Sequence, residues 1–184
     1  ILRKLIGWLV VILPKLWWSK ISTISASSNP STLCNFSLWS TKITFLGFFS
    51  AKSVTLISGF KNEEGIVFKE QLAQWKEKFN TFYTLDRDQI EGWNVGFVTQ
   101  YVSKVDFESF DGDYAVIIVG PPPMMKFTAL EAIKCGVPEE KIWQSFERKM
   151  SCAIGKCGHC RIDEVYVCLD GPVFNYTVSK DLID

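Results

Sequence analysis

The chain lacks acidic residues over its first third. No Asp or Glu precedes Glu63, whereas seven Lys or Arg side chains do, so residues 1–62 carry a formal charge of +7 in a chain whose net charge is zero. The rest of the chain holds 13 basic and 20 acidic side chains. Such a step in charge marks a boundary, and an acidic main part argues against nucleic acid as a partner, because phosphate backbones bind basic surfaces.

Familiar catalytic signatures are scarce as well. The single histidine, His159, lies between two cysteines, so no convincing Ser-His-Asp or Cys-His arrangement can be assembled, which disfavours a hydrolase. A Walker-type phosphate loop is also missing. The apolar run at 5–13 ends at Pro14 and is shorter than the roughly 20 residues of a membrane span. We therefore expect no nucleotide hydrolase and no spanning helix.

Residues 1–52 show no pattern of a packed domain. They are rich in Ser, Thr and Phe after residue 19 and have no sustained helical or strand periodicity. The run at 5–13 resembles the apolar region of a signal peptide, although Trp17 and Trp18 follow it closely. A membrane-associating extension and an out-of-frame segment are the alternatives. The expectation is an irregular N-terminal segment.

Regular patterns begin at Ser53. A β-rich run at 54–58 is followed by a segment in which apolar residues recur at helical spacing (Phe68, Leu72, Trp75 and Phe79). Residues 81–85 predict the next strand, and 95–102 predict a short helix.

The continuous apolar run at 114–119 is typical of a strand buried on both faces of a parallel sheet. A helix over about 126–135 follows it. Because strands alternate with helices, residues 53–147 predict an α/β domain, an open parallel sheet with helices on both faces. The buried strand leads into Gly120, Pro121 and Pro122, at the carboxyl edge where such sheets bind ligands, although prolines there also suit a merely stiff loop.

Four cysteines give the most specific local signal. Cys152, Cys157, Cys160 and Cys168 follow a C-x4-C-x2-C-x7-C spacing whose opening is that of plant-type 2Fe–2S proteins. A structural zinc site is the main alternative, but it usually uses two C-x2-C pairs, and only one is present. Disulfides or unligated thiols remain a third possibility. With four thiols available, His159 is expected beside the centre rather than on it. Residues 148–184 thus predict a small metal-binding subdomain.

The two other cysteines are interpreted as free thiols with packing roles. Cys34 lies in the irregular N-terminal segment, and Cys135 lies at the end of a predicted helix.

Residues 53–184 resemble the ferredoxin-NADP reductase-like flavoproteins, and within them the branch of the anaerobic sulfite reductase B subunits. The resemblance rests on residues 119–125, 146–150, the cysteine loop and, most strongly, residues 164–168 and 171–176. It implies a ferredoxin-NADP reductase-type NAD-binding domain followed by a 2Fe–2S loop held by the four cysteines. Other members of the family are the electron-transfer subunit of dihydroorotate dehydrogenase and the gamma subunits of sulfhydrogenases.

The resemblance implies a cytoplasmic, NAD(P)H-dependent oxidoreductase subunit. Electrons would pass from NAD(P)H through FAD to the 2Fe–2S cluster, and then to the iron–sulfur and sirohaem subunits of an anaerobic sulfite reductase, the second of which reduces sulfite. Gly120, Pro121 and Pro122 match positions near the nicotinamide, while Gly59 and Asp86 match positions beside the nucleotide more loosely. Val119 stands where some relatives have a cysteine.

The sequence departs from the family at its N-terminal side. The Arg-x-Tyr-Ser motif of the flavin-binding barrel and the glycine-rich pyrophosphate turn are not recognisable, since residues 1–52 contain only Gly7 and Gly47. An incomplete reductase is therefore expected, with no recognisable domain for FAD. Alternatives are an electron-transfer subunit of the dihydroorotate dehydrogenase or sulfhydrogenase type, or a zinc-stabilised interaction module without redox activity.

Overall fold

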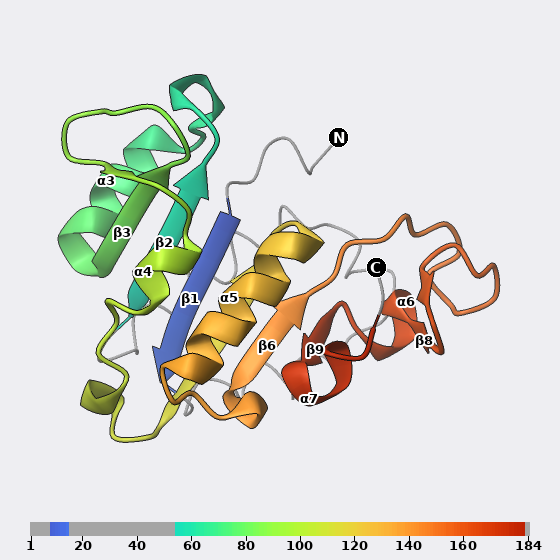
Figure 1. The fold of residues 1–184 in the computed structure, drawn as a ribbon. Coiled ribbons are helices and arrows are strands. Elements are labelled where there is room, and N and C mark those ends of the chain that lie inside the picture. Colours follow the sequence, from blue (N-terminus) through green and yellow to red (C-terminus); the bar gives the residue numbers. More distant parts are fainter. Residues whose placement is uncertain (1–7, 15–53, 183–184) are drawn as a thin grey trace.

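A mixed seven-stranded sheet forms the centre of the protein. The structure, a computed structural model, describes residues 8–14 and 54–182 (Figure 1). The strands follow the order β4-β3-β2-β1-β5-β6-β9 across the sheet, and β7 and β8 form a separate two-stranded ribbon. The strands are β1 (Trp8–Pro14), β2 (Thr55–Phe60), β3 (Asn80–Leu85), β4 (Asn94–Val95), β5 (Tyr114–Val119), β6 (Ile142–Ser145), β7 (Arg161–Ile162), β8 (Val165–Tyr166) and β9 (Val173–Asn175).

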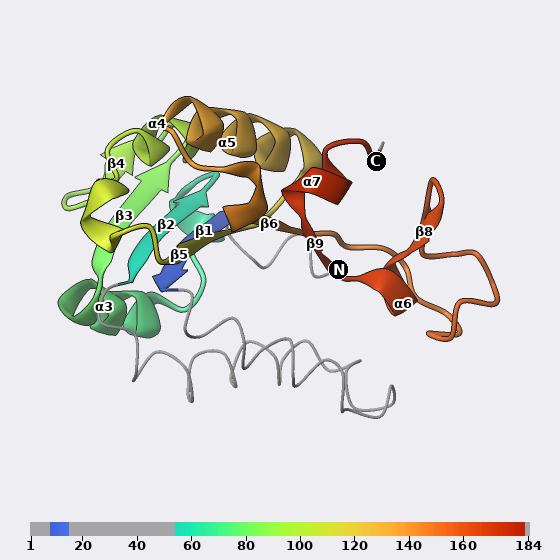
Figure 2. The ribbon, with the colours of Figure 1, turned by 90° about the horizontal axis from the view of Figure 1, so that it is seen from below.

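Helices cover both faces of this sheet, as predicted. Figure 2 shows α3 on one side and α4 and α5 on the other. The α-helices are α3 (Lys69–Lys78), α4 (Thr99–Val102), α5 (Pro122–Lys134), α6 (Val167–Asp170) and α7 (Tyr176–Ser179), and the 3-10 helices are η4 (Glu63–Gly65), η5 (Glu108–Phe110) and η6 (Glu139–Lys141). None of the helices in the described part of the chain has the length and apolar character needed to cross a bilayer.

The sheet is parallel except at two strands. Strand β2 runs parallel to β3, β3 to β4, and β5 to β6, while β9 is antiparallel at one edge. Strand β1 lies in the middle, antiparallel to both β2 and β5. The predicted α/β architecture is confirmed, with a mixed sheet in place of a purely parallel one.

Strand β1 differs from the expected irregular N-terminal segment. Its residues Val10, Val11 and Ile12 are buried, as in a strand covered on both faces. A short apolar run without alternation does not distinguish a buried strand from a targeting segment, so periodicity could not reveal it. Because β1 is antiparallel, its amino end lies at the edge where β2, β3, β5 and β6 end. Residues 15–53, including Cys34, lie outside the described residues.

The helices follow from their local sequence. Helix α5 begins at Pro122, four residues earlier than expected, because proline suits a first turn whose N–H groups have no partner within the helix. Helix α3 begins after Phe68, which adopts a left-handed conformation and is 59% exposed. Of the predicted apolar stripe only Leu72 is buried, and Trp75 and Phe79 are partly buried. The helix expected over 95–102 is reduced to the single turn α4.

The C-terminal segment is joined to the sheet at its base and projects beyond the end of the sheet (Figure 1). Chain residues 146–172 leave the sheet after β6 and return at β9, and the Phe146 amide donates to the Pro172 carbonyl at 2.9 Å across the base. Buried Cys160, Ile162 and Val167 continue the core on the α4 and α5 side. The cysteines are therefore carried by an excursion whose base is fixed to the sheet.

Candidate functional site

The predicted nucleotide-binding residues lie at one edge of the sheet. Gly59 of β2 pairs with Thr84 of β3, and the Asp86 amide continues the ladder by donating to the Phe60 carbonyl at 3.0 Å. Gly120 directly follows β5, whose carboxyl end lies at the same edge. The structure therefore brings Gly59, Asp86 and Gly120 to the edge where open α/β sheets bind ligands.

Strand β1 separates the two halves of this edge. Gly59 pairs with Trp8 of β1, and the next β1 residue pairs with Val119 of β5. Two strand spacings, roughly 10 Å, therefore lie between the ends of β2 and β5. Since β1 begins rather than ends here, this strand supplies no strand-to-helix turn to the edge.

Thr84 is a polar residue at this edge that the sequence analysis missed. It is fully buried, and its Oγ1 atom has no hydrogen-bond partner among the described residues. Tyr83 and Leu85 belong to the core beside α3, so strand alternation places Thr84 on the opposite face, towards α4 and α5. The sequence does contain one indication of Thr84, because it places a hydroxyl residue at the end of an apolar strand, two residues before Asp86.

The Asp86 carboxylate is the second unpartnered polar group of the edge. Its Oδ1 atom is buried and makes no hydrogen bond within the described part of the chain. Burial raises the pKa of Asp86, while the positive charges of Arg87 and Lys61 oppose this rise. Buried polar atoms without partners are rare in proteins and commonly mark places where a ligand or water completes the bonding.

The proline-rich turn at the end of β5 suits a flat ring better than an anion. Pro121, Pro122 and Pro123 have no N–H groups, so the first turn of α5 offers few of the donors with which a helix N-terminus binds phosphate. Gly120 carries no side chain, so a planar group can approach the backbone closely. The turn provides a surface for packing.

Gln144 fixes this turn to the C-terminal segment. The side chain is buried in β6, where its Nε2 donates to the Met125 carbonyl of α5 at 3.0 Å and its Oε1 accepts from the Ser179 hydroxyl of α7 at 2.7 Å. Val119 pairs with Ser145, so Gly120 lies beside Phe146, the first residue of the cysteine excursion. The predicted nicotinamide turn and the base of the cysteine segment are therefore adjacent.

The four cysteine thiols gather in two pairs. Cys152 lies close enough to Cys157, and Cys160 close enough to Cys168, to shift the pKa of the neighbouring thiol. Cys160 is buried, whereas Cys157 is exposed. The two pairs also interact electrostatically, because Cys152 contributes to the raised pKa of Cys168. All four predicted ligands are thus brought to one region.

Backbone amides point at these sulfur atoms. The Ile154 and Cys157 amides donate to Cys152 Sγ at 3.5 and 3.4 Å. Amide hydrogen bonds, chiefly from His159, lower the pKa of Cys157, while burial is the main cause of the raised pKa of Cys168. His159 thus acts through its backbone.

The local backbone makes these contacts possible. Ala153, Gly155 and Gly158 all have positive φ angles, which bend the backbone sharply at three places in the loop. Leu169 covers Gly155 so closely that a Cβ atom at this position would meet the Leu169 side chain. The loop is wrapped tightly around its thiols.

The four loop thiols are soft ligands of the kind that both iron–sulfur clusters and zinc sites use. Among the described residues, no three His, Cys, Asp or Glu side chains are placed to hold one metal ion. A tetrahedral zinc needs four ligands around one point, whereas each iron of a 2Fe–2S cluster needs two thiolates beside its two bridging sulfides. Paired soft thiols with amides directed at sulfur are compatible with the second arrangement.

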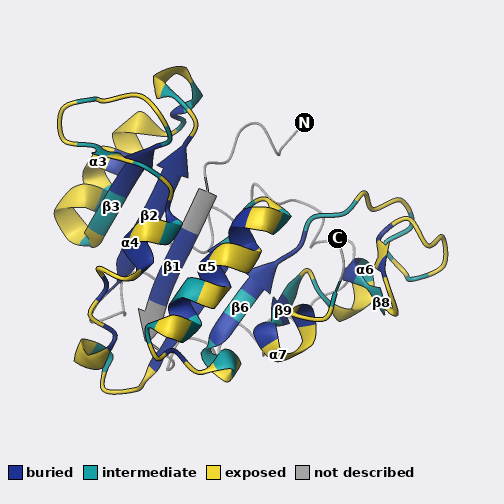
Figure 3. Ribbon diagram, in the orientation of Figure 1, coloured by how far each residue is buried: buried dark blue, intermediate teal, exposed yellow. Residues whose placement is uncertain are grey.

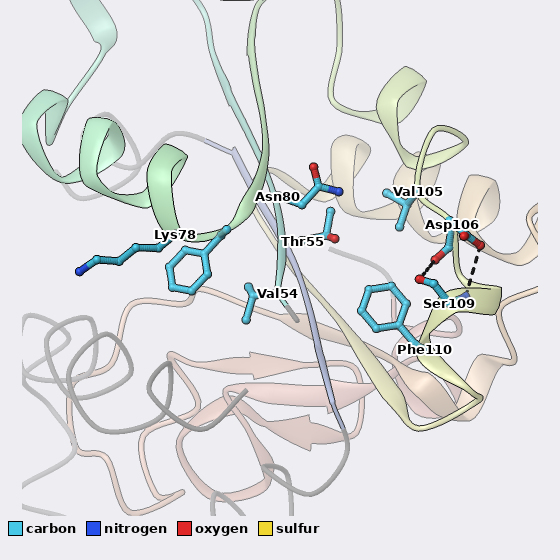
Figure 4. Close-up of a pocket in the computed structure, with 9 residues that line it drawn as sticks. Val54, Thr55, Lys78, Asn80, Val105, Asp106, Ser109 and Phe110 are labelled. Carbon is cyan, nitrogen blue, oxygen red and sulfur yellow. Dashed lines mark hydrogen bonds between the residues drawn. The ribbon is translucent and has the colours of Figure 1, made fainter. Parts of the chain in front are cut away.

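A cavity of about 220 Å³ lies at the opposite edge of the sheet (Figure 4). It is lined at the starts of β2 and β3 by Thr55 and Asn80, together with Lys78 and Phe110. The Asp106 carboxylate beside the cavity accepts a hydrogen bond from the Ser109 amide at 3.3 Å, within its own turn. None of the predicted site residues lines this cavity.

Two protein families match this chain. Residues 43–129 match the oxidoreductase NAD-binding domain, and residues 147–178 match the iron–sulfur cluster binding domain of dihydroorotate dehydrogenase B. The first match contains Gly59, Asp86 and the Gly120 turn, and the second contains all four cysteines of the loop.

Similar proteins include electron-transfer subunits. The sulfhydrogenase 2 subunit gamma of Pyrococcus furiosus is 32% identical over 68% of this chain and 49% of its own length. The electron transfer subunit of dihydroorotate dehydrogenase B from Listeria welshimeri is 33% identical over 66% of this chain and 45% of its own. A chain of the NADH-dependent reduced ferredoxin-NADP oxidoreductase has a TM-score of 0.50 at 27% identity, covering 70% of this chain and 44% of that one. This chain spans about half the length of these relatives.

Proposed function

This chain belongs to the NAD-binding oxidoreductase subunits that carry an iron–sulfur binding domain, and on that premise we propose that it passes electrons from a reduced nicotinamide to a 2Fe–2S cluster held by its four loop cysteines. One observation carries the proposal. The Gly120 turn lies directly beside Phe146, where the cysteine excursion begins, so the two sites share one edge of the sheet.

At the sheet edge, the chain's own residues bind and orient the dinucleotide. The Gly120 turn packs against the nicotinamide ring, because its prolines leave a surface poor in N–H donors. Thr84 and Asp86 have unpartnered buried oxygen atoms that suit ribose hydroxyl groups. Ligand binding there would supply the missing hydrogen bonds.

In the loop, Cys152 and Cys157 would bind one iron, and Cys160 and Cys168 the other. When bound, a 2Fe–2S cluster supplies one-electron transfer. The amides of Ile154 and Cys157, which already face Cys152 Sγ, stabilise a negatively charged sulfur and so favour the ligating thiolate form.

The electron acceptor is proposed to be a catalytic protein of the dihydroorotate dehydrogenase or sulfhydrogenase type, because the similar electron-transfer subunits are of these kinds. Residues 164–168 and 171–176 support a second candidate, the iron–sulfur and sirohaem subunits of an anaerobic sulfite reductase. FAD would link nicotinamide and cluster in the assembled cytoplasmic enzyme. No flavin-binding barrel is present among the described residues.

The metal content of the chain tests the proposal. Protein purified anaerobically should contain equal amounts of iron and acid-labile sulfide and show the visible absorption of a 2Fe–2S centre. Replacing Cys157 with Ser should reduce the iron content by roughly tenfold, since a thiolate ligand is lost. Cys135→Ser is the matched control, because Cys135 directly follows α5, outside the loop, and its replacement should leave the iron content unchanged.

Two results would contradict the proposal. One is colourless protein that contains one zinc per chain, as in a zinc-stabilised interaction module. The other is an equal loss of iron in the Cys135→Ser and Cys157→Ser variants, which would mean that the loss reflects general unfolding rather than ligand removal.

A further inference from the structure

Strand β6 carries a buried amide, the side chain of Gln144. Figure 3 shows β6 between α5 and α7, with most of the strand buried. Gln144 is only 3% exposed, and burying an amide costs free energy unless its polar atoms find partners. The partners are the Met125 carbonyl and the Ser179 hydroxyl, and both of these residues are buried as well. A buried amide that is bonded at both ends fixes the elements it joins in one arrangement.

Gln144 contacts elements that border both proposed sites. Its backbone pairs with Ile118 of β5 on one side and with Phe174 of β9 on the other. Its side chain is bonded to α5 and to α7. Strand β5 and helix α5 flank the Gly120 turn, whereas β9 and α7 follow the cysteine excursion at 146–172. Each site is therefore attached to Gln144 through one strand and one helix.

The bond to α5 reaches the Gly120 turn in one further step. Met125 lies in the first turn of α5, and its amide donates to the Pro121 carbonyl at 3.0 Å. The bond to α7 reaches the base of the excursion in a similar way, because α7 directly follows β9. The Phe174 ring of β9 packs edge-on against Phe146, where the excursion begins. A displacement of either site would thus strain the two bonds of one side chain.

We propose that Gln144 is a positioning residue that couples nucleotide binding at the Gly120 turn to cluster binding in the cysteine excursion. This inference rests on the proposed function and adds a link between its two sites. A nicotinamide ring packed on the turn would hold the start of α5, and Gln144 would pass this constraint to α7 and β9. Because coupling between binding sites is reciprocal, a bound cluster would strengthen nucleotide binding by the same factor.

The affinity for NAD⁺ with and without the cluster tests the coupling. The full chain is purified anaerobically, its iron and sulfide are measured, and a portion is freed of its cluster with a chelator. Circular dichroism checks that the sheet of the cluster-free chain stays folded. We expect calorimetry to show that NAD⁺, which cannot reduce the cluster, binds the loaded chain about fivefold more tightly. ADP-ribose, which lacks the nicotinamide ring and leaves the turn empty, should bind both forms equally.

Variants show whether the coupling passes through Gln144. Gln144→Met keeps an unbranched side chain of similar length and removes both hydrogen bonds, so NAD⁺ should bind its loaded and cluster-free forms equally. Ser179→Ala breaks only the bond to α7 and should have the same effect, which keeps the test available if Gln144→Met does not fold. The matched control is Thr128→Val, which removes a buried hydroxyl of α5 that donates to Met124 and should preserve the fivefold difference.

The results separate failure of this inference from failure of the proposed function. Three outcomes overturn the coupling alone: equal NAD⁺ affinity of the loaded and cluster-free parent chain, a parental difference in Gln144→Met or Ser179→Ala, or an equal loss of the difference in Thr128→Val. A chain that holds no iron and sulfide, or that does not bind NAD⁺, overturns the proposed function instead.

Discussion

The sheet edge and the cysteine loop are constructed in opposite ways. The edge brings together Gly59, Thr84 and Gly120, which are far apart in the sequence, and fixes them by strand pairing over a buried core. The loop brings together cysteines between Cys152 and Cys168 through local turns, amide contacts and little burial. Long-range packing positions the first site, and short-range chain geometry positions the second.

The difference predicts how each site responds to damage. The edge should be preformed, because its residues belong to strands whose positions the core determines. The loop should depend on its bound cluster for stability, since metal binding in such segments contributes folding free energy. Perturbations of the core should therefore affect the whole protein, whereas those of the loop should mainly affect the cluster.

The largest contrast is expected for two truncations to alanine. Ile118→Ala removes a fully buried side chain from β5 and should lower the free energy of unfolding by about 2–5 kcal/mol. Leu169→Ala removes a side chain that is 60% exposed and should change it by no more than about 0.5 kcal/mol. Urea denaturation of both variants measures the difference. Equal losses would show that the loop is as firmly packed as the sheet.

The same contrast explains what could be predicted from the sequence. The cysteine spacing is local, so the sequence alone predicts the four loop thiols as ligands, and the apolar run at 114–119 correctly predicted the buried strand β5. The sequence did not indicate Thr84 as a candidate binding residue. Its place at the edge depends on its pairing with Gly59 and on the burial of its hydroxyl, and neither can be read from a local sequence pattern. The position of β1 was missed for a related reason, since strand partners and direction are set by long-range contacts.

A pair of glycine substitutions tests the wrapping of the loop. Gly155 and Gly158 both have positive φ angles, so alanine at either position should cost about 1 kcal/mol of backbone strain. At Gly155 the new methyl group would also meet Leu169, whereas at Gly158 nothing lies within 4 Å. Gly155→Ala should therefore accelerate cluster loss to a chelator several-fold more than Gly158→Ala does.

A double variant distinguishes contact from strain. Adding Leu169→Ala to Gly155→Ala should return the rate of cluster loss to that of Gly158→Ala, because the obstructing side chain is gone. If the double variant loses its cluster as fast as Gly155→Ala alone, Leu169 does not cover the loop in the way the structure shows.

Removing the unpartnered hydroxyl tests whether the edge is preformed for a ligand. Thr84→Val keeps the side-chain shape and should stabilise the free protein by about 1 kcal/mol, because a buried hydroxyl without a partner is lost. NADH affinity, measured by titration of nucleotide fluorescence, should fall about fivefold if the hydroxyl contacts the nucleotide. The matched control is Thr128→Val, which removes a buried hydroxyl that donates to Met124 Sδ at 3.1 Å and should destabilise the protein. Destabilisation by both variants would mean that Thr84 already has a partner.

The smallest effect concerns the pH dependence of the edge. Burial raises the pKa of Asp86 above that of the unfolded chain, so the native state binds more protons than the unfolded state between the two values. The stability that this group contributes is present below the unfolded pKa, near 3.9, and is lost as the pH rises through the folded pKa. Asp86→Asn removes this loss, so the variant should become more stable relative to the parent protein as the pH increases from about 3 to 7.

Asp88→Asn, which removes a carboxylate that accepts from the Glu63 amide at 3.0 Å, controls for the loss of one negative charge from the same loop. Urea midpoints across this pH range measure the effect, and a difference between Asp86→Asn and the parent that stays constant with pH would show that the carboxylate is hydrated, so that the edge is more open than the sheet core beneath it.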